Sequence, residues 1–338
     1  VPVISSASLT TDTTPTISGT AEVGSVVKVT LGSGSNTSTW NVTATDGTWS
    51  IDTSTTATST TGSGYTIATN GTNAVSVTAT DAAGNVSAAG TQTLTIDSTA
   101  PTVAITDDTG GTSAVNGDIT FTFTFSEAIS DFLAEDITVA NGTKGAFSQT
   151  SSTVYTLIVT PDANSTSAVT VDVAQDKATD AAGNNNTAAP QATQAVDTAA
   201  PPTPTIAAIT TPDNDSTPTI TVTAENGSTV KVYANGDLLG TATNTSGTTH
   251  TLTPSALPDG NYSITAVATD TTGNASAEAV PQNIIIDVVK DGVPVISSAS
   301  LTTDTTPTIS GTAEVGSVVK VTLGSGSNTS TWNVTATD

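Results

Sequence analysis

Short runs of apolar residues that alternate with threonine or serine recur along the whole chain. Typical runs are SVVKVTL (25–31), AVSVTAT (74–80) and QTLTID (92–97). Because successive side chains of a strand point to opposite faces, this period of two predicts strands with one buried face. Asn-Gly and Asp-Gly pairs at positions 46, 70, 141, 226, 235 and 259 indicate tight turns between strands. Helix signals are almost absent, and SDFLAED (130–136) predicts a single turn. The fold class predicted is therefore all-β.

Recurring phrases divide the chain into domains. TLTID, QAVD and NIIID end at Asp97, Asp197 and Asp287, and spacings of about 90 to 100 residues are the size of Ig-like β-sandwiches. DTTPTISGTAEVGSVVKV near the start resembles DSTPTITVTAENGSTVKV in the third segment, whereas the second segment has ITFTFTFSEAISDF instead. We therefore predict tandem Ig-like β-sandwich domains arranged end to end, with the second a divergent subtype. The predicted boundaries are 1–97, 98–197, 198–291 and a partial fourth domain, 292–338.

The last 46 residues of the chain, 293–338, repeat residues 1–46 letter for letter. Identity over such a length exceeds what a shared fold requires, so it indicates a tandem array of repeats. Residues 293–338 supply only the first three or four strands of a sandwich. We expect them to leave a large apolar face unpaired.

The charge balance excludes two classes of partner. The chain has 30 Asp and Glu against 6 lysines and arginines, which gives a net charge of −24. Nucleic acid and anionic membranes bind through Lys and Arg, so neither is an expected partner, and no apolar run predicts membrane insertion. Small cations suit such a surface. Since cysteine is absent, disulfides and thiolate metal sites are also excluded.

One acid recurs immediately before a Gly-Asn corner. The phrases ATDAAGN (79–85 and 178–184) and ATDTTGN (268–274) place Asp81, Asp180 and Asp270 sixteen or seventeen residues before the closing acids. In a seven-strand sandwich the loop between the last two strands lies at the pole where the chain enters, and the last strand leaves at the opposite pole. Each of these acids is therefore predicted to face the preceding domain.

Two further loops bring acids to the same junctions. The loop after the second strand lies at the entry pole and carries Glu22, Glu127 or Glu225; the first loop lies at the exit pole and carries Asp12, Asp107, Asp108, Asp213 and Asp215. The predicted groups are Asp97 and Asp12 with Glu127 and Asp180; Asp197 and Asp107 or Asp108 with Glu225 and Asp270; and Asp287, Asp291 and Asp213 or Asp215 with Glu314.

Two interpretations of these acids stay open. An Asp before a Gly-Asn corner commonly accepts backbone N–H bonds in an Asx-turn, which needs no ligand. A local turn does not need the fixed spacing to the closing acid, however, and clustered like charges favour a counter-cation. Oxygen ligands without His or Cys select hard cations, and Ca²⁺ where the geometry is loose. The predicted cofactor is thus Ca²⁺ at the interdomain junctions.

The phrases SGTAEVGSVVKV, DGTWSI, ATDAAGN and IDSTAP in the first segment resemble bacterial Ig-like repeats, as do FSEAISDFLAEDITVANGT and ATDAAGN in the second. The resemblance is to tandem repeats of giant RTX-type adhesins and biofilm proteins. It implies calcium-stiffened spacers, with Asp81, Asp97, Asp180, Asp197, Asp270 and Asp287 as the calcium-binding acids. The third linker, IDVVKDGVP, is longer than the others and adds Lys290.

Catalytic chemistry has little support in this sequence. The single histidine, His250, lies in the alternating run TTHTLTP and is predicted to face solvent. Without a second His or any Cys, a Ser/His/Asp relay or a transition-metal site is not expected, and acids confined to loops at the poles do not suit a glycosidase pair. Trp40, Trp49 and Trp332 are interpreted as core or sheet-face residues rather than as sugar-stacking residues. We predict that the chain is not an enzyme.

The predicted function is mechanical. We expect an extracellular spacer, at the bacterial cell surface or in a biofilm matrix, whose partners are Ca²⁺, neighbouring domains of the same chain and other copies in a fibre. A self-associating matrix filament or surface-layer protein is one alternative, and a carbohydrate-binding module is another.

Overall fold

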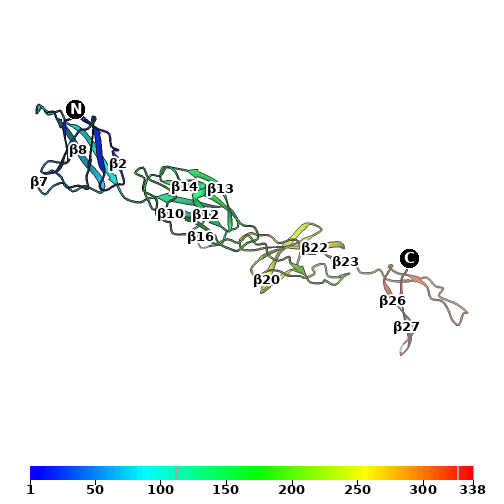
Figure 1. Ribbon diagram of the computed structural model, residues 1–338. Helices are drawn as coiled ribbons and strands as arrows, with labels where there is room; N and C mark the ends of the chain where they lie inside the picture. The colour runs from blue at the N-terminus through cyan, green and yellow to red at the C-terminus, as the bar shows by residue number, and fades with distance from the viewer. Residues whose placement is uncertain (111–112, 326, 338) are drawn as a thin grey trace. The chain divides into compact units, whose positions relative to one another are not determined.

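The computed structural model describes residues 1–110, 113–325 and 327–337, which form two compact units, Val1–Ala199 and Ala200–Asp338. Strands and one 3-10 turn, η1 (Ala134–Asp136), make up the regular structure of the described residues. No helix in this part of the chain is long and apolar enough to cross a membrane. The all-β prediction is confirmed, as Figure 1 shows. The 3-10 turn η1 falls inside the segment predicted to form one turn.

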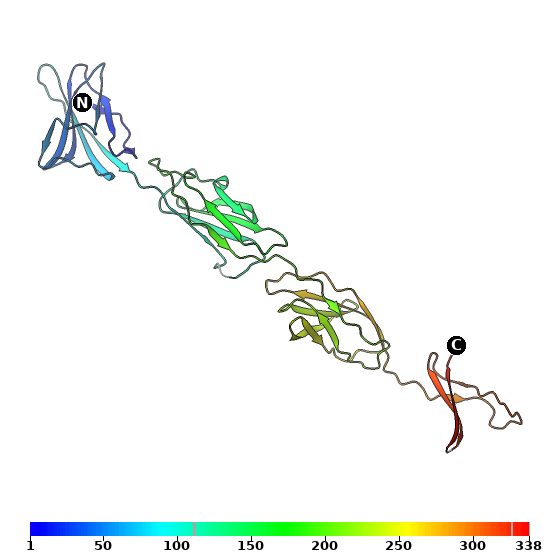
Figure 2. The same ribbon diagram turned by 60° about the horizontal axis from the view of Figure 1, so that its bottom comes forward.

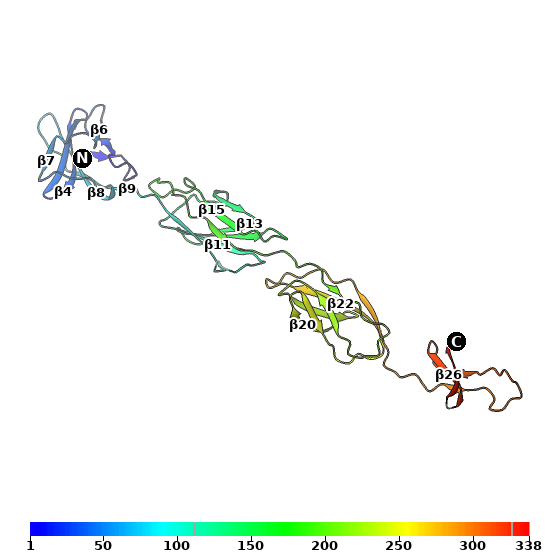
Figure 3. The same ribbon diagram turned by 90° about the horizontal axis from the view of Figure 1, so that it is seen from below.

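The first domain packs two sheets face to face. β1, β3 and β6 form one sheet, and the other has the order β2-β9-β8-β4-β5-β7 (Figure 3). Alternate residues of each strand enter the core, so that Val27, Val29 and Leu31 of β4 are fully buried while Lys28 between them is exposed. The strands are β1 (Val3–Ile4), β2 (Leu9–Thr10), β3 (Thr16–Thr20), β4 (Val26–Ser33), β5 (Asn36–Thr43), β6 (Thr48–Asp52), β7 (Ser59–Thr61), β8 (Asn70–Thr80) and β9 (Gly90–Asp97).

The first stretch of the chain is divided between the two sheets. β1 pairs antiparallel with β3, and β2 then crosses to pair parallel with the last strand, β9, with Thr10 opposite Ile96. The loop after β2 therefore starts beside the residue that closes the domain, Asp97. Parallel bridges between Val115 and Val196 and between Asp213 and Ile286 repeat this arrangement in the next two domains.

The second domain has a larger aromatic core than the other two. Its sheets have the orders β10-β11-β14-β13 and β12-β15-β16. All five phenylalanines of the chain lie here, and Phe121, Phe123 and Phe125 occupy alternate positions of one strand. The strands are β10 (Val103–Asp107), β11 (Ile119–Phe125), β12 (Ile137–Ala140), β13 (Gly142–Gln149), β14 (Val154–Pro161), β15 (Val169–Val173) and β16 (Ala192–Gln194).

The third domain joins its sheets through one shared strand, β20. The order is β17-β18-β21-β20-β19-β22-β23, in which the first half of β20 pairs with β19 and its second half with β21. Tyr262 of β22 donates a hydrogen bond of 2.9 Å to the carbonyl of Pro258, as in the tyrosine corner of Ig-like sandwiches. The strands are β17 (Thr205–Ile206), β18 (Ile220–Thr223), β19 (Thr229–Ala234), β20 (Asp237–Ser246), β21 (Thr249–Leu252), β22 (Gly260–Thr269) and β23 (Gln282–Ile286).

The prediction that His250 faces solvent is wrong, because its side chain is only 1% exposed. His250 and Leu252 lie two residues apart on β21 and share its inward face, so the alternation that packs the partly buried leucine against the core also buries the histidine. The ring nitrogen Nε2 lies 3.2 Å from both the Ser228 carbonyl and the Asn244 amide nitrogen. His250 is therefore a hydrogen-bonded core residue.

Residues 293–338 form two separate strand pairs. β24 (Val295–Ile296) pairs with β25 (Gly311–Thr312), and β26 (Val318–Ser325) pairs with β27 (Asn328–Thr335). β26 and β27, drawn in red in Figure 2, form a two-stranded sheet, and no other strand of the described residues pairs with either of them. Trp332 on β27 is 50% exposed, whereas its counterpart Trp40 is 7% exposed, so the expected unpaired apolar face is present.

Candidate functional site

The Gly-Asn corner that recurs in each domain is an Asx-turn. Asp180 Oδ1 accepts the backbone N–H groups of Ala182 (2.8 Å), Gly183 (2.7 Å) and Asn184 (2.9 Å), and Oδ2 accepts the Asn184 side-chain amide at 2.8 Å. Gly183 has a φ of +95°, a conformation that favours glycine over residues with a Cβ. Asp81 and Asp270 accept equivalent bonds in their own turns. The local role of these acids is thus present in all three domains.

Asp180 also belongs to a group of three acids. One carboxylate oxygen from each of Asp97, Glu127 and Asp180 lies within 4.8 Å of the other two, and no other group of three or more His, Cys, Asp or Glu residues meets this condition in the described part of the chain. Asp97 ends β9 of the first domain, whereas Glu127 follows β11 and Asp180 precedes the Gly-Asn corner of the second. Asp180 therefore forms the Asx-turn and also lies in the acid group at the junction.

Hydrogen bonds of the second domain hold this junction. Asn184 donates through its side-chain amide to the carbonyl oxygen of Asp97 at 2.8 Å, in addition to its bond to Asp180. The N–H of Ser126, next to Glu127, donates to the carbonyl of Thr102 in the linker at 2.9 Å. The acid of the first domain is thus fixed against the two acids of the second.

Asp131 and Asn186 support the site, and the sequence argument missed both. The Asp131 carboxylate accepts the backbone N–H of Thr179 (2.8 Å) and its hydroxyl (2.6 Å), which ties the Glu127 loop to the residue before Asp180. Asn186 is 2% exposed, and its side chain makes four hydrogen bonds at the base of the same turn. The sequence contains one signal for Asn186, namely three consecutive asparagines at 184–186. A Gly-Asn corner needs only the first of them.

The electrostatics of the group follow from its burial and charge. Burial raises the pKa of Glu127, and the negative charges of Asp180 and Asp97 raise it further. Burial also acts to raise the pKa of Asp180, but the hydrogen bonds from Asn184, Gly183 and Ala182 outweigh it and hold this pKa below its ordinary value. The group therefore contains one firmly ionised carboxylate and one whose ionisation a neighbouring cation would favour.

The exit-pole acids cap their own loops. Asp12 Oδ1 accepts the N–H of Thr14 at 2.8 Å, and Asp12 is not part of the three-acid group. Asp107 accepts the N–H of Thr109 at 2.9 Å, and Asp108 accepts the N–H of Thr120 at 3.0 Å. The contacts of Asp12 and Asp107 are those of ordinary Asx-turns, whereas Asp108 bonds across to Thr120 of β11. None of these contacts requires or excludes a ligand.

In the second unit, acids meet again at the end of the third domain. Asp287 donates its N–H to the carbonyl of Asp213 at 2.9 Å, and Asp215 accepts the N–H of Thr217 at 2.8 Å. The side-chain hydrogen bond between Glu314 and Asp291 is the largest cause that raises the pKa of Glu314, followed by the charge of Asp291, burial and the charge of Asp287. Asp291 and Glu314 are therefore neighbours, but Asp287, Asp291 and Glu314 do not meet the distance condition of the three-acid group among the described residues, and a shared cation at the third junction stays a prediction.

Asp197 belongs to the first unit, whereas Glu225 and Asp270 belong to the second. Asp197 Oδ1 accepts the N–H of Ala199 at 3.1 Å. The carbonyl of Glu225 accepts the Ser228 hydroxyl at 2.7 Å. Whether these three acids share a cation stays a prediction.

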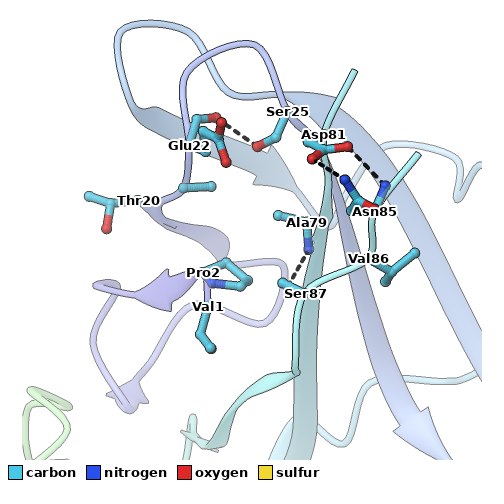
Figure 4. A pocket seen from close by; sticks show the side chains of 11 residues that line it. Val1, Pro2, Thr20, Glu22, Ser25, Ala79, Asp81, Asn85, Val86 and Ser87 are labelled. Atoms are coloured by element: carbon cyan, nitrogen blue, oxygen red, sulfur yellow. Dashed lines mark hydrogen bonds between the residues drawn. The ribbon is translucent and has the colours of Figure 1, made fainter. Parts of the chain in front are cut away.

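Glu22 and Asp81 line one pocket at the entry pole of the first domain. Figure 4 shows Glu22 beside Ser25 and Asp81 beside Asn85 around the same hollow, whose volume is about 370 Å³. The Asn85 amide donates to Asp81 Oδ2 at 2.8 Å, and this side-chain bond is the largest cause that lowers the Asp81 pKa. These two acids are the counterparts of Glu127 and Asp180.

Acid titration tests the Asx-turn of the third domain. Burial acts to raise the pKa of Asp270, but hydrogen bonds from Asn274 and Thr272 outweigh it and lower the pKa from 3.8 to about 2. Because the folded-state pKa is depressed, the stabilisation is complete above pH 3.8 and is lost as the pH falls toward 2. We expect the protection of β22 and β23 against hydrogen exchange to fall less over this range in Asp270→Asn than in the wild type.

Asp237→Asn is the matched control for that titration, since it removes the same charge from an exposed hairpin position of the third domain. Its protection should follow the wild-type pH dependence. If Asp270→Asn and Asp237→Asn show the same pH dependence, the Asp270 turn does not carry the acid sensitivity.

Comparison with known domains assigns three of the four segments. One model of a bacterial Ig-like domain matches residues 97–196, and a second such model matches residues 3–98 and 209–288. The second domain thus matches a different model from the first and third. No curated protein matches the chain.

Solved structures give only weak likenesses. The glucan-utilization-locus protein SGBP-B of Bacteroides ovatus is 16% identical over 82% of this chain and 64% of its own, with a TM-score of 0.20. The fibronectin(III)-like modules of CbhA from Clostridium thermocellum are 18% identical over 54% of this chain and 94% of their own, with a TM-score of 0.29. Invasin, a bacterial integrin-binding protein, is 14% identical over 88% of this chain and 62% of its own, with a TM-score of 0.29. The chain thus spans less than two thirds of the first and third of these proteins, and none of the three indicates what it binds.

The family models cover more than half of the chain, and they agree with its tandem β-sandwich architecture. Domains of this kind typically belong to extracellular or surface proteins and are generally not enzymes. The chain belongs to the bacterial Ig-like domain family and carries its domains in tandem.

Proposed function

We propose that the chain is an extracellular structural spacer of a large repetitive bacterial adhesin or fibre, in which Ca²⁺ stiffens the junctions between domains. One observation carries this proposal. Asp97 of the first domain lies beside Glu127 and Asp180 of the second, and one carboxylate oxygen of each lies within 4.8 Å of the other two. A cation there would bind both domains at once. It would therefore restrict the bending of the linker between them.

The donor set fits calcium. Oxygens that share one Ca²⁺ at about 2.3–2.6 Å lie at most about 5 Å apart, and the three carboxylates already satisfy that limit. Three backbone N–H groups occupy Asp180 Oδ1, whereas Oδ2 accepts one amide bond and keeps a lone pair for a ligand. Asp97, Glu127 and Asp180 would hold the ion, and Asn184 positions two of them.

Calcium would also explain how a sandwich array without cysteine keeps its junctions ordered. Disulfides are excluded by composition, and the acids of the group repel one another without a cation. Because the pKa of Glu127 is raised, protons compete with the metal, so binding should weaken as the pH falls. The same residue type at Glu22, Glu225 and Glu314 supports extending the proposal to other junctions of an array.

Calcium titration of the wild type and Glu127→Gln tests the proposal. With a Kd of about 10⁻⁴ to 10⁻³ M, about 5 mM Ca²⁺ should stabilise the bound form by roughly 1–2 kcal/mol. The substitution removes one ligand charge with little change in shape, so hydrogen exchange of residues 97–101 should slow with Ca²⁺ in the wild type and respond much less in Glu127→Gln. Glu135→Gln, an exposed acid of the same domain, is the control and should respond as the wild type does.

Stiffening itself has a separate readout. Because the chain has no cysteine, spin labels can be placed at Thr60→Cys and Ser148→Cys, which are exposed positions in the first and second domains. The distribution of distances between the labels should narrow when EDTA is replaced by Ca²⁺, and it should stay broad in Glu127→Gln. Equal widths in Ca²⁺ and EDTA would show that the ion does not stiffen this junction.

A further inference from the structure

A hollow of about 590 Å³ lies on the outer face of the larger sheet of the first domain. Thr72 and Ala74 of β8 and Thr93 of β9 line it. These three residues are exposed and alternate with buried neighbours, so they lie on the face that points away from the core. The hairpin between β4 and β5 and the segment between β7 and β8 complete the lining. The hollow is therefore separate from the three-acid group and from the pocket that Glu22 and Asp81 line.

The lining of this hollow is polar but uncharged. It contains no Asp, Glu, Lys, Arg or His, although the whole chain has a net charge of −24. Hydroxyl and amide groups both donate and accept hydrogen bonds, so they suit a ligand that carries hydroxyl groups of its own. An anionic ligand is disfavoured, because the protein is acidic and the hollow offers no cation. The polar groups are those of Ser33, Asn36, Ser63, Thr66, Thr72 and Thr93.

Tyr65 adds an aromatic ring to the hollow. A Cβ at Gly32 would lie 2.5 Å from Tyr65 Cδ2 and 2.8 Å from Tyr65 Cγ, so the ring packs directly against the backbone of Gly32. Because Tyr65 lines the hollow and is only half-buried, part of the ring stays accessible from it. The segment that carries this ring, GSGYT (62–66), occurs once in the chain. The hollow thus combines one aromatic surface with several hydroxyl and amide groups.

Hydrogen bonds to buried residues hold Tyr65 in place. Its hydroxyl donates to Asn73 Oδ1 at 2.9 Å, and its backbone N–H donates to the Ser38 hydroxyl at 2.9 Å. Asn73 is fully buried, and it also accepts the N–H of Ala68 at 2.8 Å and donates to the Ala68 carbonyl at 3.0 Å. The ring is therefore ordered before any ligand arrives, which lowers the entropy cost of binding.

We propose that this hollow binds a neutral pyranose oligosaccharide. The apolar C–H face of a sugar ring lies against the Tyr65 ring, and its hydroxyl groups exchange hydrogen bonds with the surrounding Ser, Thr and Asn side chains. The volume falls within the range of about 300–1,000 Å³ that is usual for small-molecule sites. This binding role is additional to the proposed spacer function and does not depend on calcium at the junctions.

Saturation-transfer NMR of the full chain in EDTA tests the proposal. The probes are four neutral oligosaccharides, namely cellotetraose, mannotetraose, xylotetraose and galactotetraose, and one anionic oligosaccharide, tetragalacturonate. At least one neutral probe should receive saturation from the protein. Tetragalacturonate should bind about tenfold more weakly than the neutral probe that binds best, since nothing in the lining compensates its charge.

Two positions of β9 supply matched variants. Thr91 and Thr93 are both exposed and lie on the same face of the strand, but only Thr93 lines the hollow. Thr93→Arg places a long side chain in the hollow and should weaken binding of the neutral probe about tenfold or more. Thr91→Arg introduces the same side chain beside the hollow and should change binding less than about twofold.

Tyr65 has its own pair of variants. Tyr65→Ala removes the ring and should weaken binding about tenfold or more. Tyr65→Phe keeps the ring and removes only the hydrogen bond to Asn73, so it should weaken binding less than Tyr65→Ala does. Because Tyr65→Ala can also disturb the segment before β8, the comparison of Thr93→Arg with Thr91→Arg decides independently where the sugar lies.

Any of three results would overturn the proposal. No neutral probe receives saturation at millimolar concentration, or Thr93→Arg binds the sugar as well as Thr91→Arg, which would place the sugar elsewhere. The third is binding of tetragalacturonate as tight as that of the neutral probes, which would contradict the ligand class. None of these results bears on the calcium proposal, whose tests follow the junction of Asp97 with Glu127 and Asp180.

Discussion

Replacing Phe132 by alanine is expected to lower the free energy of unfolding of the second domain by about 3–5 kcal/mol, the usual cost of deleting a buried aromatic ring. Phe132 is 2% exposed. Its ring centroid lies 5.0 Å from that of Phe125, 5.3 Å from Tyr155 and 5.7 Å from Phe123, in tilted or edge-on geometry. The substitution therefore removes both buried area and several aromatic contacts from one place.

Leu133→Ala is the control for Phe132→Ala, because Leu133 is the next residue and is 51% exposed. Hydrogen exchange of β11, β14 and β15 gives the stability of this domain separately from the others. The control should stay within about 0.5 kcal/mol of the wild type. A loss below about 1 kcal/mol in Phe132→Ala would mean that the aromatic cluster repacks around the gap.

The consequence of Phe132→Ala reaches the three-acid group. Phe132 anchors the far end of the loop that begins at Ser126, and Glu127 and Asp131 lie on that loop. When the anchor is removed, Glu127 loses its fixed position opposite Asp97. Phe132→Ala should therefore also reduce the calcium response that Glu127→Gln reduces directly.

Alternation along the chain predicted the fold because each strand buries one face. Phe121, Phe123 and Phe125 on β11 follow the period of two, as do Val27 and Val29 on β4. The same rule applied to TTHTLTP gave a wrong placement of His250, because polarity was weighed above the period that His250 shares with Leu252. The shared strand β20 was not predictable, since its two halves pair with different strands and nothing local marks the change.

The candidate site was predictable to the extent that topology fixes it. The acid of each Gly-Asn corner precedes the closing acid of its own domain by a nearly constant spacing, as Asp180 precedes Asp197. Because these two acids lie at opposite poles of a sandwich, this spacing was enough to group Asp97 of the first domain with Glu127 and Asp180 of the second. The supporting residues were not predictable from the sequence. Asp131 bonds to Thr179, which lies 48 residues further along the chain, and no spacing rule links the two positions. The Asx-turn and the acid group were weighed as alternatives, and the structure makes Asp180 part of both.

Replacing Asn186 by alanine is the second change expected to have a large effect, about 2–4 kcal/mol of lost stability in the second domain. Asn186 Oδ1 accepts the backbone N–H groups of Lys177 and Ala178, both at 2.8 Å. Its Nδ2 donates to the carbonyls of Ala174 at 2.9 Å and Thr187 at 2.7 Å. Alanine would leave four backbone groups without these partners around a side chain that is 2% exposed.

Asn185→Ala is the control for Asn186→Ala, since the neighbouring Asn185 is exposed and its loss should cost no more than about 0.5 kcal/mol. Hydrogen exchange of β15 and of residues 174–187 measures both variants. Because Lys177 and Ala178 lead directly into Thr179 and Asp180, faster exchange in Asn186→Ala should extend to the N–H groups of Ala182 and Asn184 that Asp180 accepts. If that turn keeps its protection while β15 loses its own, Asn186 stabilises the core and does not position the acid. If neither changes, water replaces all four bonds, and the buried amide contributes little to the domain.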